Sequence, residues 1–543
     1  MNHSRRSALI AAAVASITAL PAVQSNPWTL ASGLSTAAVD TLIPGAGGDS
    51  LHYDTHAIQA AIDSMAGLGG GVVVLAHGTF LSAPLTLLSN ITFQIDSSAV
   101  LLASQNFHDY YPPGADTTKP AASLVNFISS NNANNITITG PGAIDGQGQP
   151  WWDAENVAKA QGRDTVRPRL IQLTNGVHLS ISNITLRNAP MFHLCPNTSD
   201  DVAIDRVTIL APSTAPNTDG IDPGKCHHVR ITNCTIDNGD DNIAVGASSA
   251  DSRWPDAASS DIVISHCTFL HGHGVSIGSI TIGGVDTMLV DSCTFNGTDN
   301  GIRIKSDRGN GGYVRNIAYR NLTMSNVRYP VSVSEYYPNI PAQTDTAQPV
   351  TPSSKTPSYS DITIANLTSS NAASNGTAGV IVGLPESRLR NIHLFNVSIS
   401  ASKGMEVRNA TVDTTTTSIQ AAAGAPYLLE VNGSVTGAIQ DGAPERMPLP
   451  GAYRLLQNYP NPFNPVTQIQ FELPSASGVS LVVYDLLGRN VATLVNGTMG
   501  AGVHTEAWDA SRCASGIYFA RLTVRDSRGR LQFTGVNKLL LVK

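Results

Sequence analysis

Four short polar motifs contain residue types that could carry out acid–base chemistry. Hydrolysis of a glycosidic bond needs one carboxyl that donates a proton and a second carboxylate that acts as a base. Carboxylates packed together cannot all ionise freely, so at least one of them is expected to keep its proton. Nearby cations would hold an anionic group of the substrate. The motifs are Asn217-Thr218-Asp219-Gly220, Gly239-Asp240-Asp241, Gly272-His273-Gly274 and Arg303-Ile304-Lys305.

Each motif taken alone has an ordinary structural explanation, such as a turn, a loop, a corner or a solvated strand face. The argument for a shared site is their common spacing, because a polar residue lies two positions before an apolar one in each segment. If successive segments stack as parallel strands about 4.8 Å apart, these polar side chains share one outer patch. Arg303 and Lys305, at i and i+2, then point to the same face. The pairs are Asp219 and Ile221, Asp241 and Ile243, His273 and Val275, and Asn300 and Ile302.

A sequence repeat supplies the stacking that this spacing requires. A polar residue, an apolar residue and a Thr or Ser recur at intervals of 23 to 45 residues, which indicates a solenoid. The repeats are short alternating segments separated by Gly, Asn and Asp, without helical periodicity between them. We therefore predict that the main part of an all-β chain is a right-handed, single-stranded parallel β-helix. The repeats begin at Asn183, Arg206, Asn233, His266, Ser292, Asn321, Asn366 and Asn396.

The second position of every repeat is apolar and is expected to form a ladder along the interior of the β-helix. Cys234, Cys267 and Cys293 occupy this position in three successive repeats, which favours buried thiols over the alternatives of disulfides or metal ligands. Residues 55–66 have apolar residues at helical spacing, and a short helix there would cover the open first coil.

The chain divides into four predicted segments. Residues 1–25 have a charged start, an apolar run and small residues near the end, as in a signal peptide. Residues 26–438 would form the parallel β-helix catalytic domain, followed by a Pro/Gly-rich linker at 439–454. Alternating stretches between Gly/Pro turns at 455–543 predict a small antiparallel β-sandwich. We expect an exported protein, through either the general or the twin-arginine route.

The charge balance limits the classes of partner. The chain has 33 Lys and Arg residues against 40 Asp and Glu residues, a net charge of −7, which argues against a nucleic-acid partner. A polyanionic substrate would therefore have to be held by a local basic patch. Charged residues make up 13% of the chain, about half of the ~25% usual for globular proteins, which excludes a disordered or coiled-coil protein.

In their order and combination, the four motifs resemble those of the polygalacturonases, family 28 of the glycoside hydrolases. The likeness extends over about residues 36–410 and includes the segment GAIDGQGQPWW at 142–152. It implies a right-handed parallel β-helix that needs no metal and no cofactor. It also implies inverting hydrolysis of α-1,4 bonds in polygalacturonate (pectin). Endo action is favoured by the segment GHGVSIGS.

The same resemblance implies a role for each motif residue. Asp240 would be the general acid that protonates the leaving oxygen, and Asp219 and Asp241 would hold and activate the attacking water. His273 would support the protonation state of the acid. The residues expected to bind substrate are Asn217, Arg303, Lys305 and Tyr337, with Tyr336 as a less favoured neighbour of Tyr337.

The C-terminal segment has a resemblance of its own. It begins with NYPNPFNP and ends with SGIYFARL and KLLLVK, and it is similar to the C-terminal sorting domain of type IX secretion substrates. This implies an outer-membrane secretion machinery as partner and a product that is secreted or attached to the cell surface. We expect a monomer.

Four alternatives remain open from the sequence. An exo-polygalacturonase or a rhamnogalacturonan hydrolase would act on the same class of backbone, although the latter is expected to lack the histidine of GHG. A pectate lyase would use calcium at the acidic cluster. A non-catalytic β-helix adhesin would not need clustered acids.

Overall fold

The computed structural model describes the chain in two compact units, Met1–Ile439 and Gln440–Lys543. The described residues are 47–116, 123–250, 255, 257–341, 349–370, 376–437, and 453–542 except 457, 459–460, 462, 475–476, 500–501, 512 and 527–529. The predicted signal peptide lies outside these ranges, as does the predicted linker up to residue 452. Among the described residues, no helix combines the length and the apolar character needed to cross a membrane.

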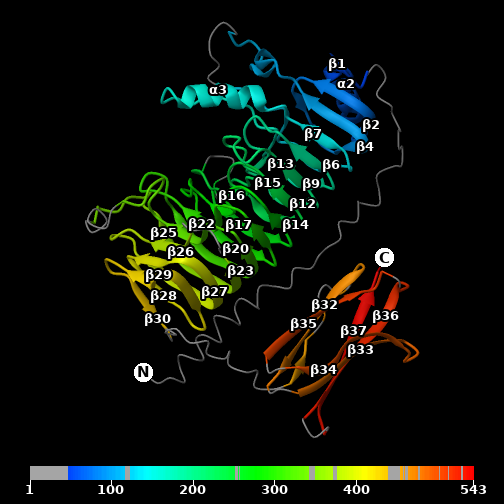
Figure 1. The fold of residues 1–543 in the computed structure, drawn as a ribbon. Coiled ribbons are helices and arrows are strands. Elements are labelled where there is room, and N and C mark those ends of the chain that lie inside the picture. Colours follow the sequence, from blue (N-terminus) through cyan, green and yellow to red (C-terminus); the bar gives the residue numbers. More distant parts are fainter. Residues whose placement is uncertain are drawn as a thin grey trace. The chain divides into compact units, whose positions relative to one another are not determined.

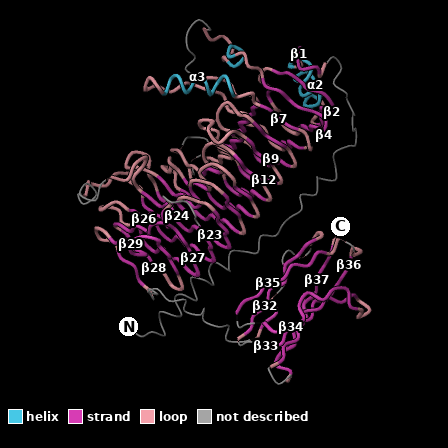
Figure 2. The backbone as a smooth tube through the Cα atoms, in the orientation of Figure 1, coloured by secondary structure: helices cyan, strands magenta, loops and turns pink. Residues whose placement is uncertain are grey.

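The first unit is a parallel β-helix, as predicted (Figure 1). Its coils pair in parallel register: β12 (Asp200–Asp205) bonds β9 (Val177–Ser182) on one side and β14 (His227–Thr232) on the other. Figure 2 shows the same strands stacked coil upon coil, with loops projecting along one flank.

The strands of this unit form three rows along the β-helix. The first row, which precedes the repeat motif, contains β1 (Asp49–Tyr53), β2 (Gly71–Ser82), β4 (Ile91–Ala103), β6 (Ile136–Thr139), β9, β12, β14, β17 (Ser259–Ser265), β20 (Val285–Asp291), β23 (Tyr313–Ser325), β25 (Ser358–Ser370) and β27 (Leu389–Arg408). The second row, which follows the motif, contains β7 (Ala143–Asp145), β10 (Thr185–Arg187), β13 (Thr208–Leu210), β15 (Thr235–Asp237), β18 (Thr268–Phe269), β21 (Thr294–Asn296) and the start of β29 (Ser418–Leu429). In the last coils, β28 (Ala410–Asp413) and β30 (Ser434–Thr436) extend the first row beyond β27. The third row contains β3 (Leu85–Thr86), β5 (Ile128–Asn131), β8 (Ile171–Thr174), β11 (Leu194–Asn197), β16 (Ile243–Val245), β19 (Val275–Ile277), β22 (Asn300–Lys305), β24 (Tyr329–Ser334) and β26 (Thr377–Val382).

The repeat motif marks the corner between the first two rows. Its first residue has a positive φ in every repeat, from 53° at Arg206 to 56° at Asn233, a conformation that Asn tolerates better than most residues. Its second residue is buried and points into the interior. The interior side chains, all at most 2% exposed, are Ile184, Val207, Cys234, Cys267, Cys293, Leu322, Leu367 and Val397.

The predicted N-terminal helix is present as α2 (Thr55–Gly67). Its Ile58 and Ile62 are fully buried in the core cluster of the β-helix, so the helix covers apolar surface as expected. The structure adds two helical segments that the sequence analysis did not predict, the 3-10 turn η1 (Phe107–Tyr110) and the helix α3 (Gln149–Lys159). Trp151 of α3 stacks on Phe107, with ring centroids 3.8 Å apart.

The second unit contains two antiparallel sheets around one apolar core, which confirms the predicted β-sandwich. Its core includes Phe471, Leu481, Trp508 and Leu522. One sheet has the order β31 (Arg454–Leu455), β32 (Val466–Leu473) and β35 (Gly502–Asp509), and the other has the order β34 (Asn490–Met499), β33 (Ser477–Asp485), β36 (Gly516–Arg525) and β37 (Leu531–Leu541).

All six cysteines are free thiols, and only Cys513 is not buried. Burial raises the pKa of Cys226 to about 12, so this thiol resists forming a reactive thiolate. We expect at most one thiol per chain to react quickly with an aromatic disulfide reagent in the native protein, and six to react in denaturant. The fast reaction should disappear in Cys513→Ser. Fewer than six reactive thiols in denaturant would show that disulfides form instead.

Candidate active site

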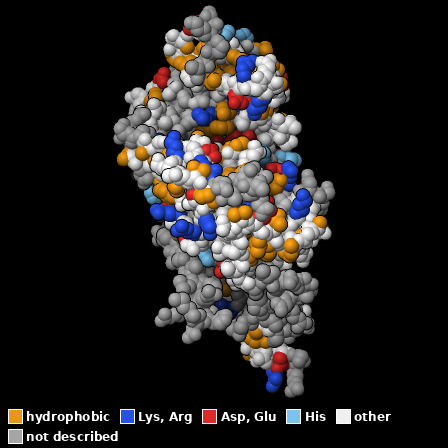
Figure 3. Space-filling model, turned by 90° about the vertical axis from the view of Figure 1, so that its left-hand side faces the viewer, with side chains coloured by type: hydrophobic (Ala, Val, Ile, Leu, Met, Phe, Trp, Pro, Cys, Tyr) orange, Lys and Arg blue, Asp and Glu red, His pale blue; other side chains and the backbone are white. Residues whose placement is uncertain are grey.

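The four motifs meet on the third row of strands. The interior residues that follow them pair in register, Ile221 with Ile243, Ile243 with Val275, and Val275 with Ile302. This is the alignment that the spacing predicted, and it brings the polar residues two positions earlier onto one flank. On the face drawn in Figure 3, acidic side chains lie at the floor of a hollow, with Lys and Arg side chains around it.

Asp241 is the most tightly bound carboxylate of the cluster. Its Oδ2 accepts from Lys305 Nζ at 2.6 Å, and its Oδ1 accepts from Arg303 Nη1 at 2.9 Å and from Ser276 Oγ at 2.7 Å. The Asp241 side chain is only 3% exposed, so these charge-assisted bonds replace its lost hydration. Arg303 and Lys305 are thereby held two coils away from the acid they bind.

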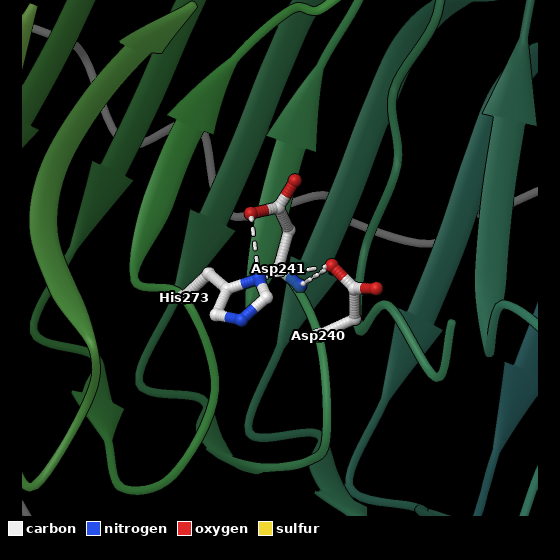
Figure 4. Close-up of side chains that lie close together, drawn as sticks. All are labelled: Asp240, Asp241 and His273. Carbon is white, nitrogen blue, oxygen red and sulfur yellow. Dashed lines mark hydrogen bonds and ion pairs between the residues drawn. The ribbon is translucent and has the colours of Figure 1, made fainter. Parts of the chain in front are cut away.

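Asp240 lies beside Asp241 but faces the solvent more. Its Oδ1 lies 3.1 Å from His273 Nδ1, and its Oδ2 accepts from Asn217 Nδ2 at 3.3 Å. Figure 4 shows the His273 ring turned toward both aspartates from the neighbouring coil. Burial raises the pKa of Asp240, but the hydrogen bond and charge of His273, together with Lys305, outweigh it, so the net pKa is lowered.

Asp219 lies in an environment that raises its pKa, whereas the pKa of Asp240 is lowered. Its side chain is buried, and its Oδ1 has no hydrogen-bond partner among the described residues. Burial, followed by the charges of Asp222, Asp240 and Asp241, raises the pKa of Asp219 well above the usual range. The expected protonated carboxyl is therefore present. In the unliganded site, however, the pKa directions favour a proton on Asp219 over one on Asp240, the residue to which the resemblance gives the acid role.

Asp222 shares this environment and was missed by the sequence analysis. Its Oδ1 is also buried without a partner among the described residues, and burial, followed by the charge of Asp241, raises the pKa of Asp222. The signal was available, because Asp222 directly follows the inward-facing Ile221. Strand alternation therefore places it on the outer face, beside the catalytic candidates.

The side-chain amides of two buried asparagines connect three of the motifs on their interior side. Asn238 Nδ2 donates to the carbonyl oxygens of Thr218 and Asp241, at 2.7 and 2.9 Å. Asn242 Nδ2 donates to Asn238 Oδ1 at 2.7 Å, and Asn242 Oδ1 accepts from the backbone N–H of Gly274 at 2.8 Å. Both asparagines are fully buried, so they fix the relative positions of the acids and the histidine.

The glycines of the GHG motif are required by this close packing. Gly272 and Gly274 have φ of 104° and 71°, and a Cβ on Gly274 would lie 2.2 Å from the carbonyl oxygen of Asn300. His273 is therefore presented between two residues that only glycine can occupy without strain, and its own N–H donates to the Asp240 carbonyl oxygen at 2.8 Å.

Helix α3 holds Asn217 from the other side. Asn217 Oδ1 accepts from Arg167 Nη2 at 2.7 Å and from Lys159 Nζ at 3.3 Å. Arg167 is buried and forms an ion pair with the equally buried Glu155 at 3.2 Å. These supporting residues were not predicted, because the helix that carries two of them was not recognised.

The structure separates the two tyrosine candidates. The Tyr337 ring faces Lys305, with Nζ 5.2 Å from the ring centroid, whereas Tyr336 faces Arg308 at 5.4 Å. Tyr337, the tyrosine that the sequence analysis favoured, therefore contacts a cation of the cluster.

The cluster also has the residue types of a metal site. Ligand atoms of Asp240, Asp241 and His273 lie within 4.8 Å of one another. Both oxygens of Asp241 already bind cationic side chains, at 2.6 and 2.9 Å. A divalent cation there would have to displace or be repelled by Arg303 and Lys305, so the arrangement favours chemistry carried out by the side chains themselves.

Residues 75–419 match the family model described as glycosyl hydrolases family 28. The chain belongs to this family. It is therefore a glycoside hydrolase, and residues 457–530 match the secretion system C-terminal sorting domain.

Individual relatives of this family 28 enzyme agree with the assignment. An endo-polygalacturonase of Pectobacterium carotovorum is 34% identical over 375 residues, which cover 66% of this chain and 87% of the relative. The solved polygalacturonase of Erwinia carotovora has 29% identity and a TM-score of 0.53, covering 71% of this chain and 92% of its own. A Yersinia enterocolitica family 28 exopolygalacturonase, at 23% identity and a TM-score of 0.62, shares the fold and covers 74% of this chain and 78% of its own.

We predict that Asn242→Ala in this family 28 enzyme lowers the free energy of unfolding by about 1–3 kcal/mol, because it leaves buried polar groups unpaired. Urea unfolding measures the effect. Asn296→Ala, at an exposed asparagine, is the matched control and should leave the unfolding midpoint nearly unchanged. Equal midpoints for the two variants would contradict a structural role for the buried amide.

Proposed function

We propose that this protein hydrolyses α-1,4-galacturonosidic bonds in polygalacturonate, with endo action and inversion of configuration. The observation that carries the proposal is the pair Asp240 and Asp241 beside the cations Arg303 and Lys305, in a chain whose net charge is −7. Carboxylates supply acid and base, and a local basic patch accepts an anionic sugar. The family and the names of its polygalacturonase relatives support this substrate.

Exposure supports Asp240 as the general acid. Its side chain is 22% exposed against 3% for Asp241, so of these two it is the carboxyl that a leaving oxygen can reach. Asp241 stays bound to two cations and suits the role of a base that, with Asp219, holds the attacking water. Inversion rests on the family resemblance.

Substrate binding would supply the protonation state that Asp240 lacks in the unliganded site. Lys305 is one of the charges that lower the pKa of Asp240. A uronate carboxylate paired with Lys305 would offset this charge and add a negative one nearby, and both effects raise the pKa of a carboxyl. The acid would thus take up its proton as the substrate enters.

Endo action is supported by the endo-polygalacturonase relatives at 34% identity. The alternative is exo action, since an exopolygalacturonase of Zea mays, 31% identical over 321 residues, also lies among the relatives. A time course of products distinguishes them: mixed oligomers at early times support endo action, whereas only monomer or dimer supports exo action.

The enzyme would reach its polymer outside the cell. We propose that residues 1–25 are a signal peptide and that the C-terminal domain engages an outer-membrane secretion machinery, which leaves the enzyme secreted or attached to the surface. The match of residues 457–530 to a secretion sorting domain supports this route.

Asp240→Asn should lower kcat for reducing-sugar release from polygalacturonate by about 100-fold or more, because the proton donor is lost. Asp237→Asn is a matched control, since Asp237 also pairs with a histidine, His271, at 2.7 Å but lies outside the cluster. Activity of the wild type should survive EDTA and give no unsaturated product absorbing in the ultraviolet. Wild-type-like turnover by Asp240→Asn would refute the role.

The pH dependence of the activity should report the uptake of a proton by Asp240 when substrate binds. An acid catalyst loses activity as pH rises through its pKa, and kcat/KM reports the free enzyme whereas kcat reports the complex. Because the pKa of Asp240 is lowered in the free site and rises on binding, the alkaline limb of kcat should lie at higher pH than that of kcat/KM. In Lys305→Gln the alkaline limbs of kcat and kcat/KM should lie closer together in pH than in the wild type. Coincident limbs in the wild type would contradict this account.

A further inference from the structure

A second positive side chain lies in the same row as the catalytic candidates, on their other side. The interior ladder continues from Ile221 to Leu194 and from Leu194 to Ile171. The residues two positions before these are Phe192 and Arg169, so Arg169 stacks in the row of Asp219, two coils away, or about 9.6 Å at the usual strand spacing.

The contacts of Arg169 leave much of its guanidinium group unengaged. Its Nη1 donates to Gln172 Oε1 at 3.0 Å, and its Cζ lies 5.3 Å from the centroid of the Phe192 ring. Its Nε is buried without a hydrogen-bond partner among the described residues. No ion pair joins its guanidinium to a carboxylate of those residues, although its charge partly offsets the raised pKa of the nearby Asp222. Arg303 and Lys305, by contrast, both bind Asp241.

The two positive groups therefore flank the acids along the stacking direction. Arg303 lies two coils beyond Asp241 on one side, and Arg169 lies two coils before Asp219 on the other. Gln172 and Phe192 hold the guanidinium plane in place, one by a hydrogen bond and the other by ring contact. A planar guanidinium of this kind is suited to a carboxylate.

We propose that Arg169 is a substrate-binding residue that holds a second uronate carboxylate, on the side of the scissile bond opposite to the one held by Arg303 and Lys305. This rests on the proposed function, because the ligand is an acidic polymer that carries carboxylates on both sides of the cleaved bond. Arg169 acts on substrate affinity and on alignment, and it takes no part in proton transfer.

The test is Arg169→Gln, with Arg169→Lys as the conservative variant, in the full chain acting on polygalacturonate. We expect Arg169→Gln to raise KM about tenfold or more with little change in kcat, and Arg169→Lys to recover part of the loss. The rise of KM with ionic strength should be steeper for the wild type than for Arg169→Gln, since a screened ion pair has been removed.

Arg206→Gln is the control for net charge, because Arg206 is exposed at a corner and bonds Asn183 Oδ1. It should leave KM unchanged. If the wild type is active and Arg169→Gln has the same KM and the same salt dependence as the wild type, the inference is overturned. A wild type inactive on polygalacturonate would instead overturn the proposed function. A lowered unfolding midpoint with unchanged KM would mean that Arg169 only packs against Phe192.

Discussion

The in-register stacking of parallel coils is the constraint on which the site depends. The buried ladder Ile221, Ile243, Val275 and Ile302 fixes how each coil lies on the next. A slip of one residue would turn every interior side chain outward, at the full cost of exposing it, so the core enforces the alignment of the polar residues two positions earlier. The geometry of the candidate site is thus a consequence of core packing, and hydrogen bonds of the buried Asn238 and Asn242 hold neighbouring coils in position.

Stacking also brings like charges together, and the three acids are accommodated in three different ways. Asp241 pairs with two cations, Asp240 forms a hydrogen bond with His273, and Asp219 has a raised pKa that favours its neutral form. At Asp219 a buried carboxyl oxygen has no hydrogen-bond partner among the residues that the structure describes, which costs stability. Such a cost at an active site is the usual exchange of stability for function.

The sequence was sufficient for the β-helix, the interior thiols and the alignment of the motifs, because all three follow from a repeating apolar position. It was insufficient for features that depend on which loop or helix covers the site. Helix α3 has too short a periodic stretch to stand out beside the strands, so Glu155, Lys159 and Arg167 were missed. Asp222 lies outside the recurring position two residues before the interior residue, so the spacing did not predict it, although the position after Ile221 also faces outward. The raised pKa of Asp219 could not be foreseen, since it depends on burial that only the folded chain defines.

The charge arrangement explains how an acidic chain can accept a polyanion without holding it too firmly. Arg303 and Lys305 carry two positive charges, but Asp241 takes up one of them, so their net attraction for a substrate carboxylate is that of about one charge. Burial and neighbouring acids raise the pKa values of Asp219 and Asp222, which favours their neutral forms and weakens the repulsion they would exert on the polymer. Under the proposal above, the guanidinium of Arg169 on the far side then balances the attraction of Arg303 and Lys305 across the cleavage point. Modest attraction on each side suits an enzyme whose two products must both leave after every cut.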